Sequence, residues 1–319
     1  MDRRRFLSIG ALAPLAGLIG CEGREPLLRV SGITWVGFEP LFLAREWKLL
    51  PPDRVRLIDS PSNTNTLMQL AAGEVEAATL TLDEFILARA GGIPVRAALI
   101  FDTSRGADVL MSRPDITTVE QLAGKRVGVE ETAAGALMLR RSLETAGLIP
   151  KDVTRVPLLG GEHLAAYRSG QVDALISYEP NATRLEAVGA HRLHDSSAFP
   201  GLIVDVLAVH ERAIDRQPRT LALLLKAHFE ALGVLRANPG RAHETIAPHL
   251  GLTTEETHRA FQGIELFDLR KNQEWLDPPA RPFQEVAGEV AGIMLVNALI
   301  DEIPRFDSVT TARFLPEGP

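Results

Sequence analysis

Two stretches of the chain repeat one pattern of hydrophobic and polar positions. Residues 70–84 and 168–180 each read as a helix end, then Gly, one polar residue, Val, an acidic residue, Ala, a short apolar run and a polar loop. The Gly suits a helix C-cap, where a left-handed backbone is needed, and the apolar run suits a buried strand. The repeat predicts two α/β lobes of related design. The alternative is one continuous doubly wound domain in which the echo arose by chance.

The residues before each repeat predict the same order of strands and helices in both halves. Strands are predicted over 29–33, 55–58, 126–129 and 153–158, and helices over 40–49, 64–72, 133–146 and 162–169. Each half therefore reads β-α-β-α-β, which implies parallel strands joined by right-handed crossovers. Ligands of such sheets bind outside the carboxyl ends of the strands. Two lobes set face to face would place a hinged cleft between these ends.

The last third of the chain has a different pattern. After Pro218, helices are predicted over 221–237, 254–263 and 283–299, and no strand pattern is present. We expect this helical tail to pack on lobe one. The predicted lobes are 21–104 with 208–319 for lobe one and 105–207 for lobe two, with crossings near 101–108 and 203–210.

Composition excludes several classes of protein. The 319 residues are 45% hydrophobic, carry a net charge of -7 and include a single cysteine, so a disulfide within the chain is excluded. No basic surface for nucleic acid is indicated. The Gly-x-Ser-x-Gly, His-Glu-x-x-His and Gly-x-x-x-x-Gly-Lys motifs are absent, and His191 and His194 lack a third metal ligand nearby. We expect a monomer with no metal, no cofactor and no enzymatic activity.

The N-terminus reads as an export signal. Arg3, Arg4 and Arg5 precede an apolar run, 9–19, that is too short to span a bilayer. The run ends at Cys21, as in the lipobox of bacterial lipoproteins, although Ile19 replaces the usual small residue. The Arg-Arg-Arg-Phe-Leu segment also resembles a twin-arginine signal. We predict a signal peptide over 1–20 and a lipid anchor at Cys21, in the periplasm or at the cell exterior; the alternative is an incidental cysteine.

Polar and aromatic residues gather in the loops that follow the predicted strands. The candidate ligand-binding residues are Trp35, Phe38, Glu39, Ser60, Asn63, Thr81, Asp102, Ser104, Asp108, Glu130, Thr132, Tyr178, Glu179 and Asp205. Aromatic rings such as Trp35 can stack on a flat ligand or seal the joint between strand and helix. For most single residues here, helix capping or a turn is the alternative role.

Several of these segments resemble one family. Residues 35–45 (Trp-Val-Gly-Phe-Glu-Pro-Leu-Phe-Leu-Ala-Arg), 102–108, 122–129 (Leu-Ala-Gly-Lys-Arg-Val-Gly-Val) and 170–180 resemble periplasmic solute-binding proteins of ABC importers. The group is the nitrate/sulfonate/taurine-like and thiamine-precursor-like (NMT1/THI5-like) one, with the type II fold. The resemblance implies a protein that captures a solute in a hinged cleft and presents it to a membrane permease. A ligand sensor that docks a signalling protein, or a THI5-like pyrimidine-forming enzyme, are the alternatives.

The charges of the candidate loops bear on the ligand. The loops carry many carboxylates, and Arg105 is the single basic residue among them. Like charges in a closed cleft repel strongly, whereas carboxylates pair with ammonium groups and accept from N–H groups. We therefore expect a small nitrogen-containing solute, cationic or heterocyclic, rather than nitrate or a simple sulfonate. The alternative is that these acids cap helices or point away from the cleft.

Overall fold

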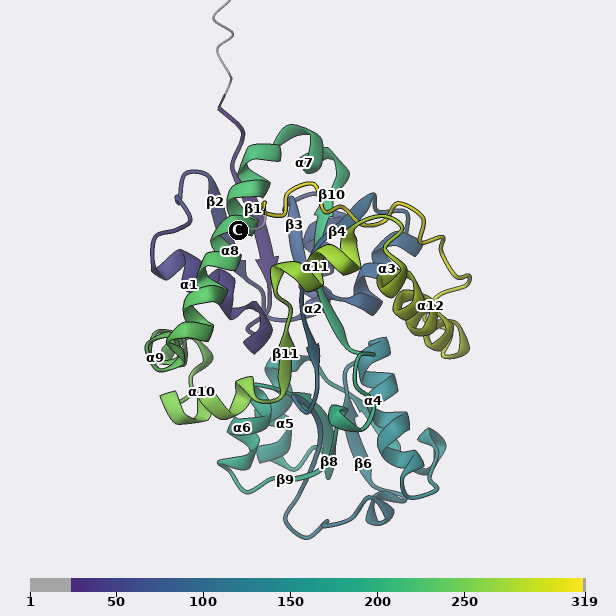
Figure 1. Cartoon of the computed structure of the whole chain (residues 1–319). Coiled ribbons are helices and arrows are strands. Elements are labelled where there is room, and N and C mark those ends of the chain that lie inside the picture. The colour runs from purple at the N-terminus through teal and green to yellow at the C-terminus, as the bar shows by residue number, and fades with distance from the viewer. Residues whose placement is uncertain (1–23, 318–319) are drawn as a thin grey trace, which may run out of the picture.

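Two separate β-sheets organise the chain, one in each lobe (Figure 1). The computed structural model describes residues 24–317, so the predicted signal peptide and Cys21 lie outside the described residues. The larger lobe has strand order β11-β4-β10-β3-β1-β2 and the smaller lobe β7-β6-β8-β5-β9. The two-lobed α/β architecture predicted from the sequence is confirmed.

The strands are short and the helices vary widely in length. The strands are β1 (Leu28–Gly32), β2 (Val55–Asp59), β3 (Ala77–Thr81), β4 (Val95–Ser104), β5 (Asp108–Ser112), β6 (Arg126–Val129), β7 (Thr154–Pro157), β8 (Ala174–Tyr178), β9 (His191–Asp195), β10 (Val204–His210) and β11 (Ile264–Leu266). The helices are α1 (Glu39–Glu46), α2 (Asn63–Ala71), α3 (Leu82–Ala90), α4 (Ala133–Glu144), α5 (His163–Ser169), α6 (Asn181–Glu186), α7 (Glu211–Arg216), α8 (Pro218–Ala237), α9 (Pro239–Leu250), α10 (Thr254–Phe261), α11 (Leu269–Leu276) and α12 (Arg281–Val296).

Each lobe contains three parallel strands, arranged in the same way in both lobes. In the larger lobe β1 lies between β2 and β3, and in the smaller lobe β6 lies between β7 and β8. The glycines of the sequence repeat precede β3 and β8, and both have a left-handed backbone, with φ of 72° at Gly73 and 78° at Gly170. Only glycine adopts this conformation readily. The repeat therefore marks equivalent helix-to-strand turns in the two lobes.

An ion pair is repeated along with the turns. The Arg29 guanidinium lies 2.6 Å from the Glu76 carboxylate, and the Arg126 guanidinium lies 2.7 Å from the Asp173 carboxylate. In each pair the residues are 47 positions apart, and the acid also accepts from the backbone N–H of the arginine at 2.9 Å. Each pair joins the start of the central parallel strand to the residue before the next one, so the two lobes share a contact as well as an element order.

Three chain segments meet where the lobes join. Strand β4 ends at Ser104 in the larger sheet and β5 begins at Asp108 in the smaller one, while β10 returns the chain to the larger sheet. The Gly263 carbonyl, just before β11, accepts from the backbone N–H groups of Arg105 and Ala107 at 2.8 and 3.0 Å. The expected boundary between residues 207 and 208 falls inside β10, and the lobe boundaries stay a prediction.

The C-terminal part contains one strand that the sequence analysis did not expect. Strand β11 pairs antiparallel with β4 at the edge of the larger sheet, where Ile264 lies opposite Ser104. Three residues are too few to show the alternation that indicates a strand, so its pairing comes from the neighbouring edge. Helices α9 and α11 were also not predicted. The tail covers the larger lobe, but α12 reaches α4 of the smaller lobe (Figure 1).

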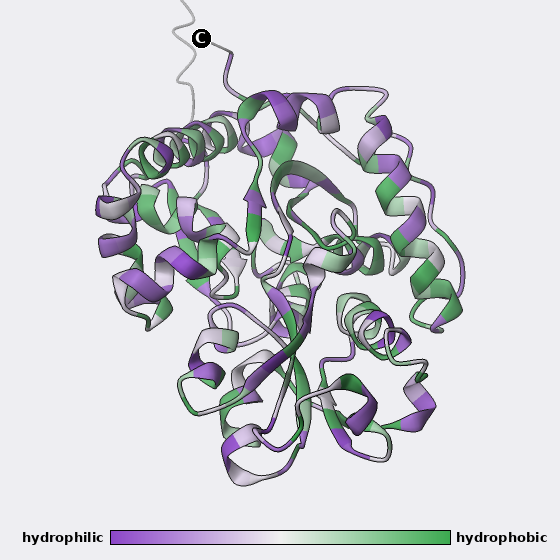
Figure 2. Cartoon of the chain, turned by 60° about the horizontal axis from the view of Figure 1, so that its bottom comes forward, coloured by the Kyte–Doolittle hydropathy of each residue, from purple (hydrophilic) through white to green (hydrophobic). Residues whose placement is uncertain are grey.

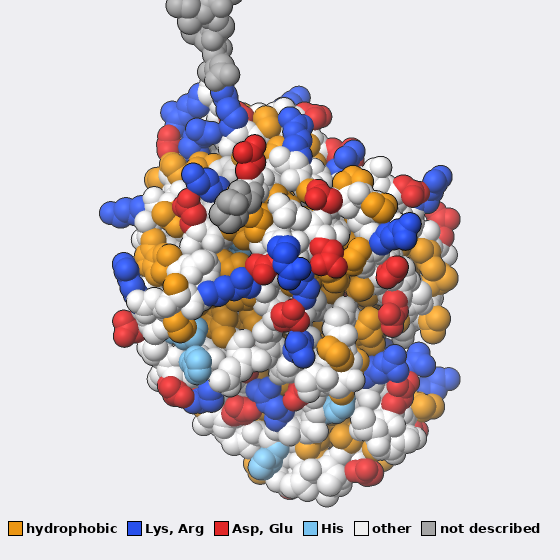
Figure 3. Space-filling model, in the orientation of Figure 1, with side chains coloured by type: hydrophobic (Ala, Val, Ile, Leu, Met, Phe, Trp, Pro, Cys, Tyr) orange, Lys and Arg blue, Asp and Glu red, His pale blue; other side chains and the backbone are white. Residues whose placement is uncertain are grey.

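Strand β10, in the interior of the larger sheet, is buried along most of its length. Residues Val204–Val209 of β10 are buried, as expected for a central strand covered on both faces. Figure 2 shows hydrophobic residues along the central strands and the inward sides of the helices. On the face drawn in Figure 3, basic and acidic side chains are interspersed. Among residues 24–317, no helix combines the length and the apolar character needed to cross a bilayer.

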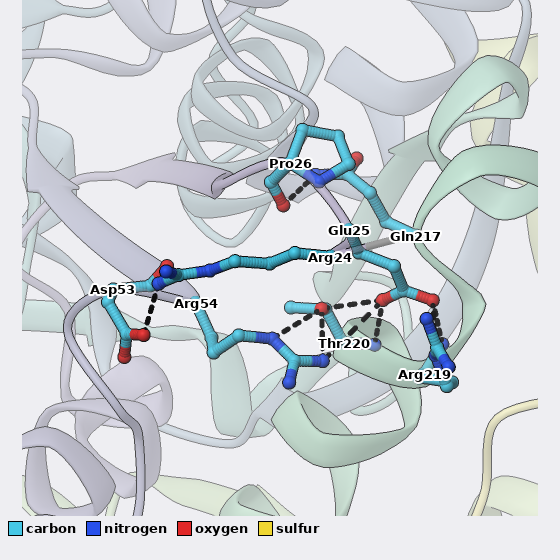
Figure 4. Close-up of polar contacts among 8 residues, drawn as sticks. All are labelled: Arg24, Glu25, Pro26, Asp53, Arg54, Gln217, Arg219 and Thr220. Atoms are coloured by element: carbon cyan, nitrogen blue, oxygen red, sulfur yellow. Dashed lines mark hydrogen bonds and ion pairs between the residues drawn. The ribbon is translucent and has the colours of Figure 1, made fainter. Parts of the chain in front are cut away.

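The first described residues are held by helix α8 (Figure 4). The buried Glu25 carboxylate accepts from the backbone N–H groups of Arg219 and Thr220, at 3.0 and 2.8 Å, and from the Thr220 hydroxyl at 2.7 Å. Arg54 lies 3.7 Å away. A carboxylate here satisfies N–H groups of the first helical turn and complements the helix dipole. Burial raises the pKa of Glu25, but these hydrogen bonds outweigh it and leave the pKa below its ordinary value.

Candidate functional site

A cavity lies between the two lobes, at the ends of strands from both sheets. Its volume is about 590 Å³ when the part that is open to solvent is included. The lining residues are Ile33, Trp35, Phe38, Asn63, Thr81, Asp108, Glu130, Thr132, Ala134, Gly135, His163, Ile176, Tyr178, Ile203 and Asp205. A cavity between lobes that is mostly apolar, with a few converging polar groups, is the usual form of a small-molecule site.

The larger lobe supplies the aromatic wall and several polar groups. Trp35 and Phe38 come from the loop between β1 and α1, while Asn63 opens helix α2. Thr81 ends β3 just before α3, and Asp205 lies on β10 opposite Thr81 in the sheet register. These positions follow from the β-α connections of a parallel sheet, which bring the first residues of successive helices to one edge.

The smaller lobe supplies most of the remaining polar groups. Asp108 opens β5 and pairs in register with Tyr178, the last residue of β8. Glu130 follows β6, and the Thr132 hydroxyl caps α4 by accepting from the Gly135 N–H at 3.0 Å. His163 opens α5. The site is therefore built by equivalent strand ends in two lobes, as the sequence predicted.

Contacts close the cavity from lobe to lobe. The Trp35 and Tyr178 rings meet edge to face, with centroids 6.0 Å apart. The Asp83 carboxylate at the start of α3 accepts from the Ala134 N–H at the start of α4, at 3.1 Å. On the other side, the Arg184 guanidinium of α6 donates to the Leu250 carbonyl at the end of α9. These contacts hold the lobes together around the cavity.

The carboxyl groups around the cavity are buried and close to one another. Burial raises the pKa of Asp108 to about 7, with a further rise from the charges of Asp83 and Glu179. Burial and Asp83 likewise raise the pKa of Glu130 to about 7. For Asp205, burial and the neighbouring Asp102 and Asp108 raise the pKa well above its ordinary value. Asp108 and Glu130 are therefore only partly ionised at neutral pH unless a cation stabilises their charge.

Several buried polar atoms of the cavity wall lack a hydrogen-bond partner within the described chain. They are Asn63 Oδ1, Thr81 Oγ1, Asp108 Oδ2, Glu130 Oε1 and His163 Nε2. Buried polar groups are normally paired, because leaving one unpaired costs about 1–3 kcal/mol. Their concentration at one cavity makes it the candidate binding site.

His163 is the polar lining residue that the sequence analysis missed. Its Nδ1 lies 3.0 Å from the Ser177 hydroxyl, which leaves Nε2 toward the cavity. Burial lowers the pKa of His163 to about 4, so the ring is neutral at neutral pH. Its place at the start of α5, directly after the β7-to-α5 loop, was the available signal. The apolar lining residues Ile33, Ala134, Gly135, Ile176 and Ile203 were missed as well.

Some predicted site residues lie outside the cavity. Glu39 belongs to a separate hollow, where its carboxylate lies 2.9 and 3.1 Å from His249 Nδ1. Ser60 donates to the Ser62 carbonyl at 3.1 Å, and Glu179 pairs with Arg192 at 3.1 Å and with the Thr183 N–H. These three have structural partners within the chain.

Asp102 and Ser104 lie behind the cavity wall and support it. The Asp102 carboxylate accepts from Trp35 Nε1 at 3.3 Å, which orients the indole. The Ser104 hydroxyl accepts from the Asp108 N–H at 3.2 Å and lies 2.7 Å from the Ser196 hydroxyl. Both residues therefore position groups that line the site.

A second hollow adjoins the cavity and is also acidic. It shares Glu130 and Thr132 with the cavity and adds Asp83, Glu84, Glu131 and Glu162. Neither hollow is lined by Lys or Arg. Over residues 24–317, no group of three or more His, Cys, Asp and Glu side chains is arranged to hold a metal ion.

Known proteins share this architecture. The taurine-binding periplasmic protein of Escherichia coli (strain K12) is 24% identical over 181 residues, which cover 56% of this chain and 56% of that protein. The alkanesulfonate-binding protein SsuA from Xanthomonas axonopodis pv. citri, bound to MOPS, has a TM-score of 0.71 at 20% identity, covering 90% of this chain and 98% of that one. The match to the taurine-binding relative thus spans about half of its length.

An enzyme has the same fold. The desulfurization enzyme DSZB has a TM-score of 0.66 at 21% identity, covering 90% of this chain and 97% of that one. At such identities the likeness establishes the fold alone, which is that of periplasmic binding proteins. The sequence profile of the NMT1-like family matches residues 23–248, a range that includes every residue lining the cavity. The chain therefore belongs to the NMT1-like family.

Proposed function

We propose that this protein is an extracytoplasmic solute-binding lipoprotein that captures a small molecule between its lobes and delivers it to the permease of an ABC importer. The observation that carries the proposal is the cavity itself, whose walls come from strand ends of two lobes. A ligand that contacts both walls stabilises the closed form, because binding shifts a hinged protein toward the state that makes more contacts with it.

The relatives support a binding role. The taurine-binding relative is a periplasmic protein, and the alkanesulfonate-binding protein has the same fold as this chain. This favours a periplasmic location for this chain. The enzyme DSZB shows that the same fold can also carry out catalysis. The choice between a binding protein and an enzyme therefore depends on the residues that line the cavity. The cavity is lined by neither Ser nor Cys, and the single cysteine of the chain is Cys21. The lining thus offers no serine or cysteine nucleophile, and a binding protein is the better proposal.

The anchor belongs to the same proposal. Glu25, four residues after Cys21, is held at the start of α8 (Figure 4). In Figure 1 this segment lies at the end of the larger lobe opposite the smaller lobe. A lipid at Cys21 would tether that end and leave the cleft accessible from solution. Stable anchoring needs more than one acyl chain.

The capture step is tested with protein purified without denaturation and with the same protein stripped of solute by unfolding and refolding. We expect mass spectrometry to find one small molecule released from the native sample. Small-angle scattering should give a smaller radius of gyration before stripping than after it. A stripped sample of unchanged radius, with no solute in the native sample, would contradict a hinged solute-binding protein.

The anchor is tested separately by metabolic labelling with a fatty-acid analogue. The wild type should carry the label and partition with membranes. Cys21→Ala should lose the label while its soluble form still binds the solute found in the native sample. Equal labelling of both proteins would contradict an anchor at Cys21 and leave the capture role unaffected.

A further inference from the structure

The polar atoms of the cavity are mostly hydrogen-bond acceptors. Asn63 Oδ1, Asp108 Oδ2 and Glu130 Oε1 are buried without a partner within the described chain, and each can only accept when the carboxyl groups are ionised. The residues themselves are at least nine-tenths buried, with exposed fractions of 7%, 8% and 8%. A ligand that satisfies these atoms must bring donors, which can be N–H or O–H groups.

The charges of the side chains around the cavity also bear on the ligand. Acids face the cavity or its mouth from both lobes, and Arg192, which lies behind the wall, is paired with Glu179 at 3.1 Å and with Glu186 at 3.1 Å. The titratable groups at the cavity, at its mouth or behind its wall are Asp83 and Glu84 of α3, Asp102 of β4, Asp108 of β5, Glu130 and Glu131 after β6, Glu162 before α5, His163 of α5, Tyr178 of β8, Glu179 after β8, Arg192 of β9 and Asp205 of β10. Either protonation or a bound cation offsets the repulsion among these acids, and a cation is the form that a ligand can supply.

Two of the helix N-termini beside the cavity, those of α3 and α4, donate to the protein's own groups, although such ends usually attract anions. The start of α4 donates from Ala134 to the Asp83 carboxylate and from Gly135 to the Thr132 hydroxyl. The Glu84 carboxylate accepts from the Thr81 N–H at the start of α3, at 3.1 Å. An anionic ligand would have to displace these carboxylates or lie beside them. The cavity therefore disfavours a sulfonate, even though relatives of this chain bind sulfonates.

We infer that the solute is a small organic cation bearing N–H donors, an ammonium or amidinium group, bound by Asp108, Glu130 and Asp205 with loss of protons from these carboxyl groups. The inference rests on the proposed solute-binding role. Trp35 and Tyr178 lie against the same cavity and can cover the cation with their rings. The cation takes the place of the protons, so ligand binding and proton release are one equilibrium.

This linkage predicts a pH dependence with a definite sign. Burial raises the pKa of Asp108 and Glu130 to about 7 in the unliganded protein. Below that pH the cation must displace protons, so affinity rises with pH by up to about tenfold per pH unit for each proton released. The rise should level off above about pH 8, because these carboxyl groups are then ionised before the ligand arrives.

The test is a thermal-shift panel of matched small probes on the solute-stripped full-length mature protein. Ethylammonium, 1,3-diaminopropane and acetamidinium supply N–H donors with positive charge, tetramethylammonium supplies charge alone, and ethanesulfonate is the anion. Taurine is unsuitable as a discriminator because it carries both charges. We expect the first three to raise the melting temperature, more at pH 8 than at pH 6, and the other two to leave it unchanged.

Charge-removing variants locate the site. Glu130→Gln and Asp108→Asn keep the shape of the side chains and should weaken binding of the most effective probe by roughly thirtyfold or more. Glu39→Gln is the matched control, because Glu39 is also a buried acid with a pKa raised to about 7 but lies in a separate hollow. Glu39→Gln should bind the probe as the wild type does. Calorimetry in two buffers of different ionisation enthalpy should show proton release on binding for the wild type and for Glu39→Gln.

The outcomes separate this inference from the proposed function. A rise in melting temperature with ethanesulfonate and none with the amines or the amidine would overturn the cation while solute binding stands. Equal weakening by Glu39→Gln and Glu130→Gln would also overturn it, because the effect would then not come from the cavity. If neither the amines nor the amidine raise the melting temperature, the inference of a cationic solute is contradicted. If the native sample also carries no solute, the proposed function fails too.

Discussion

At the scale of single residues, Gly37 sets how closely the Trp35 loop approaches Asp102. A Cβ atom added at Gly37 would lie 1.7 Å from an Asp102 carboxylate oxygen and 2.6 Å from Trp35 Nε1. Neither distance is compatible with van der Waals contact, so a side chain here would break the hydrogen bond that orients the indole. The glycine is thus required by a close approach of backbone and side chain rather than by an unusual backbone angle.

Gly37→Ala should therefore lower the free energy of unfolding by about 1–3 kcal/mol and weaken solute binding, because Trp35 loses its place in the wall. Urea unfolding followed by tryptophan fluorescence measures the first effect, and a binding titration the second. The control is Gly233→Ala in α8, where an added Cβ meets nothing within 4 Å. That variant should be more stable by about 0.5–1 kcal/mol, and a loss of stability equal to that of Gly37→Ala would contradict the argument.

At the scale of elements, the two lobes show how a local pattern becomes a repeated structure. The turns at Gly73 and Gly170 and the ion pairs of Glu76 and Asp173 recur at equivalent positions, and each lies beside a parallel strand that ends at the cleft. Helix α8 differs, because its first turn is satisfied by Glu25 from the distant N-terminal segment. That contact joins two elements that no local pattern links.

Glu25→Ala should lower the free energy of unfolding by about 1–2 kcal/mol, because it removes acceptors from the first turn of α8. The matched control is Glu230→Ala on the exposed side of the same helix, where the side chain lies 3.7 Å from Lys226 in a half-exposed ion pair. Such pairs contribute little, so the control should change stability by less than about 0.5 kcal/mol. Chemical denaturation of both variants measures the difference, and equal losses would count against a capping role.

At the scale of the whole molecule, contacts between lobes decide whether the cavity is closed. Arg184 of α6 donates to the Leu250 carbonyl at the end of α9, and neither residue lines the cavity. Because closure and binding are coupled, a variant that weakens closure weakens affinity without touching the ligand. The same reasoning gives the helical tail a role in binding, since α9 belongs to it.

Arg184→Ala should enlarge the radius of gyration of the liganded protein measured by small-angle scattering and weaken binding by roughly threefold to tenfold. Arg155→Ala, an exposed position on β7 of the same lobe, is the control and should change neither quantity. If Arg184→Ala lost affinity with an unchanged radius, its effect would have to come from elsewhere than closure.

The buried acids also affect the stability of the whole molecule. Burial raises the pKa of Asp102, Asp108, Glu130 and Glu39 to about 7, well above their values in an unfolded chain. The folded state therefore holds protons that the unfolded state has released, and the stability contributed by these groups is lost as the pH rises through about 7. The buried His163 and His228 have lowered pKa values and act in the opposite sense only at more acidic pH.

The melting temperature of the solute-stripped protein should accordingly fall between about pH 6.5 and about pH 8. Glu130→Gln removes one of the four acids and should make the fall shallower. The wild-type fall should also shrink when a cationic ligand is bound, because the ligand then stabilises the ionised carboxylates. A melting temperature that rises over this range would show that the acids are ionised in the unliganded fold.

The sequence by itself determined the elements and their order. The β-α-β-α-β pattern, the glycine turns at Gly73 and Gly170 and the placement of polar residues after strands all depend on periodicity and backbone preference within a few residues. Because parallel strands bring their carboxyl ends to one edge, this local information also predicted most polar residues of the cavity, including Trp35, Asp108 and Asp205. It did not separate the residues that line the cavity from those just behind it.

Only the tertiary structure decided which partners those residues take. Glu39 follows the same loop as Trp35, yet it turns to His249, which lies 210 residues away along the chain. His163 enters the site because α5 begins at its edge, and β11 exists because three residues pair with the open side of β4. These outcomes depend on contacts between distant segments, whose geometry is set by the packing of the whole chain and leaves no periodic trace in the sequence.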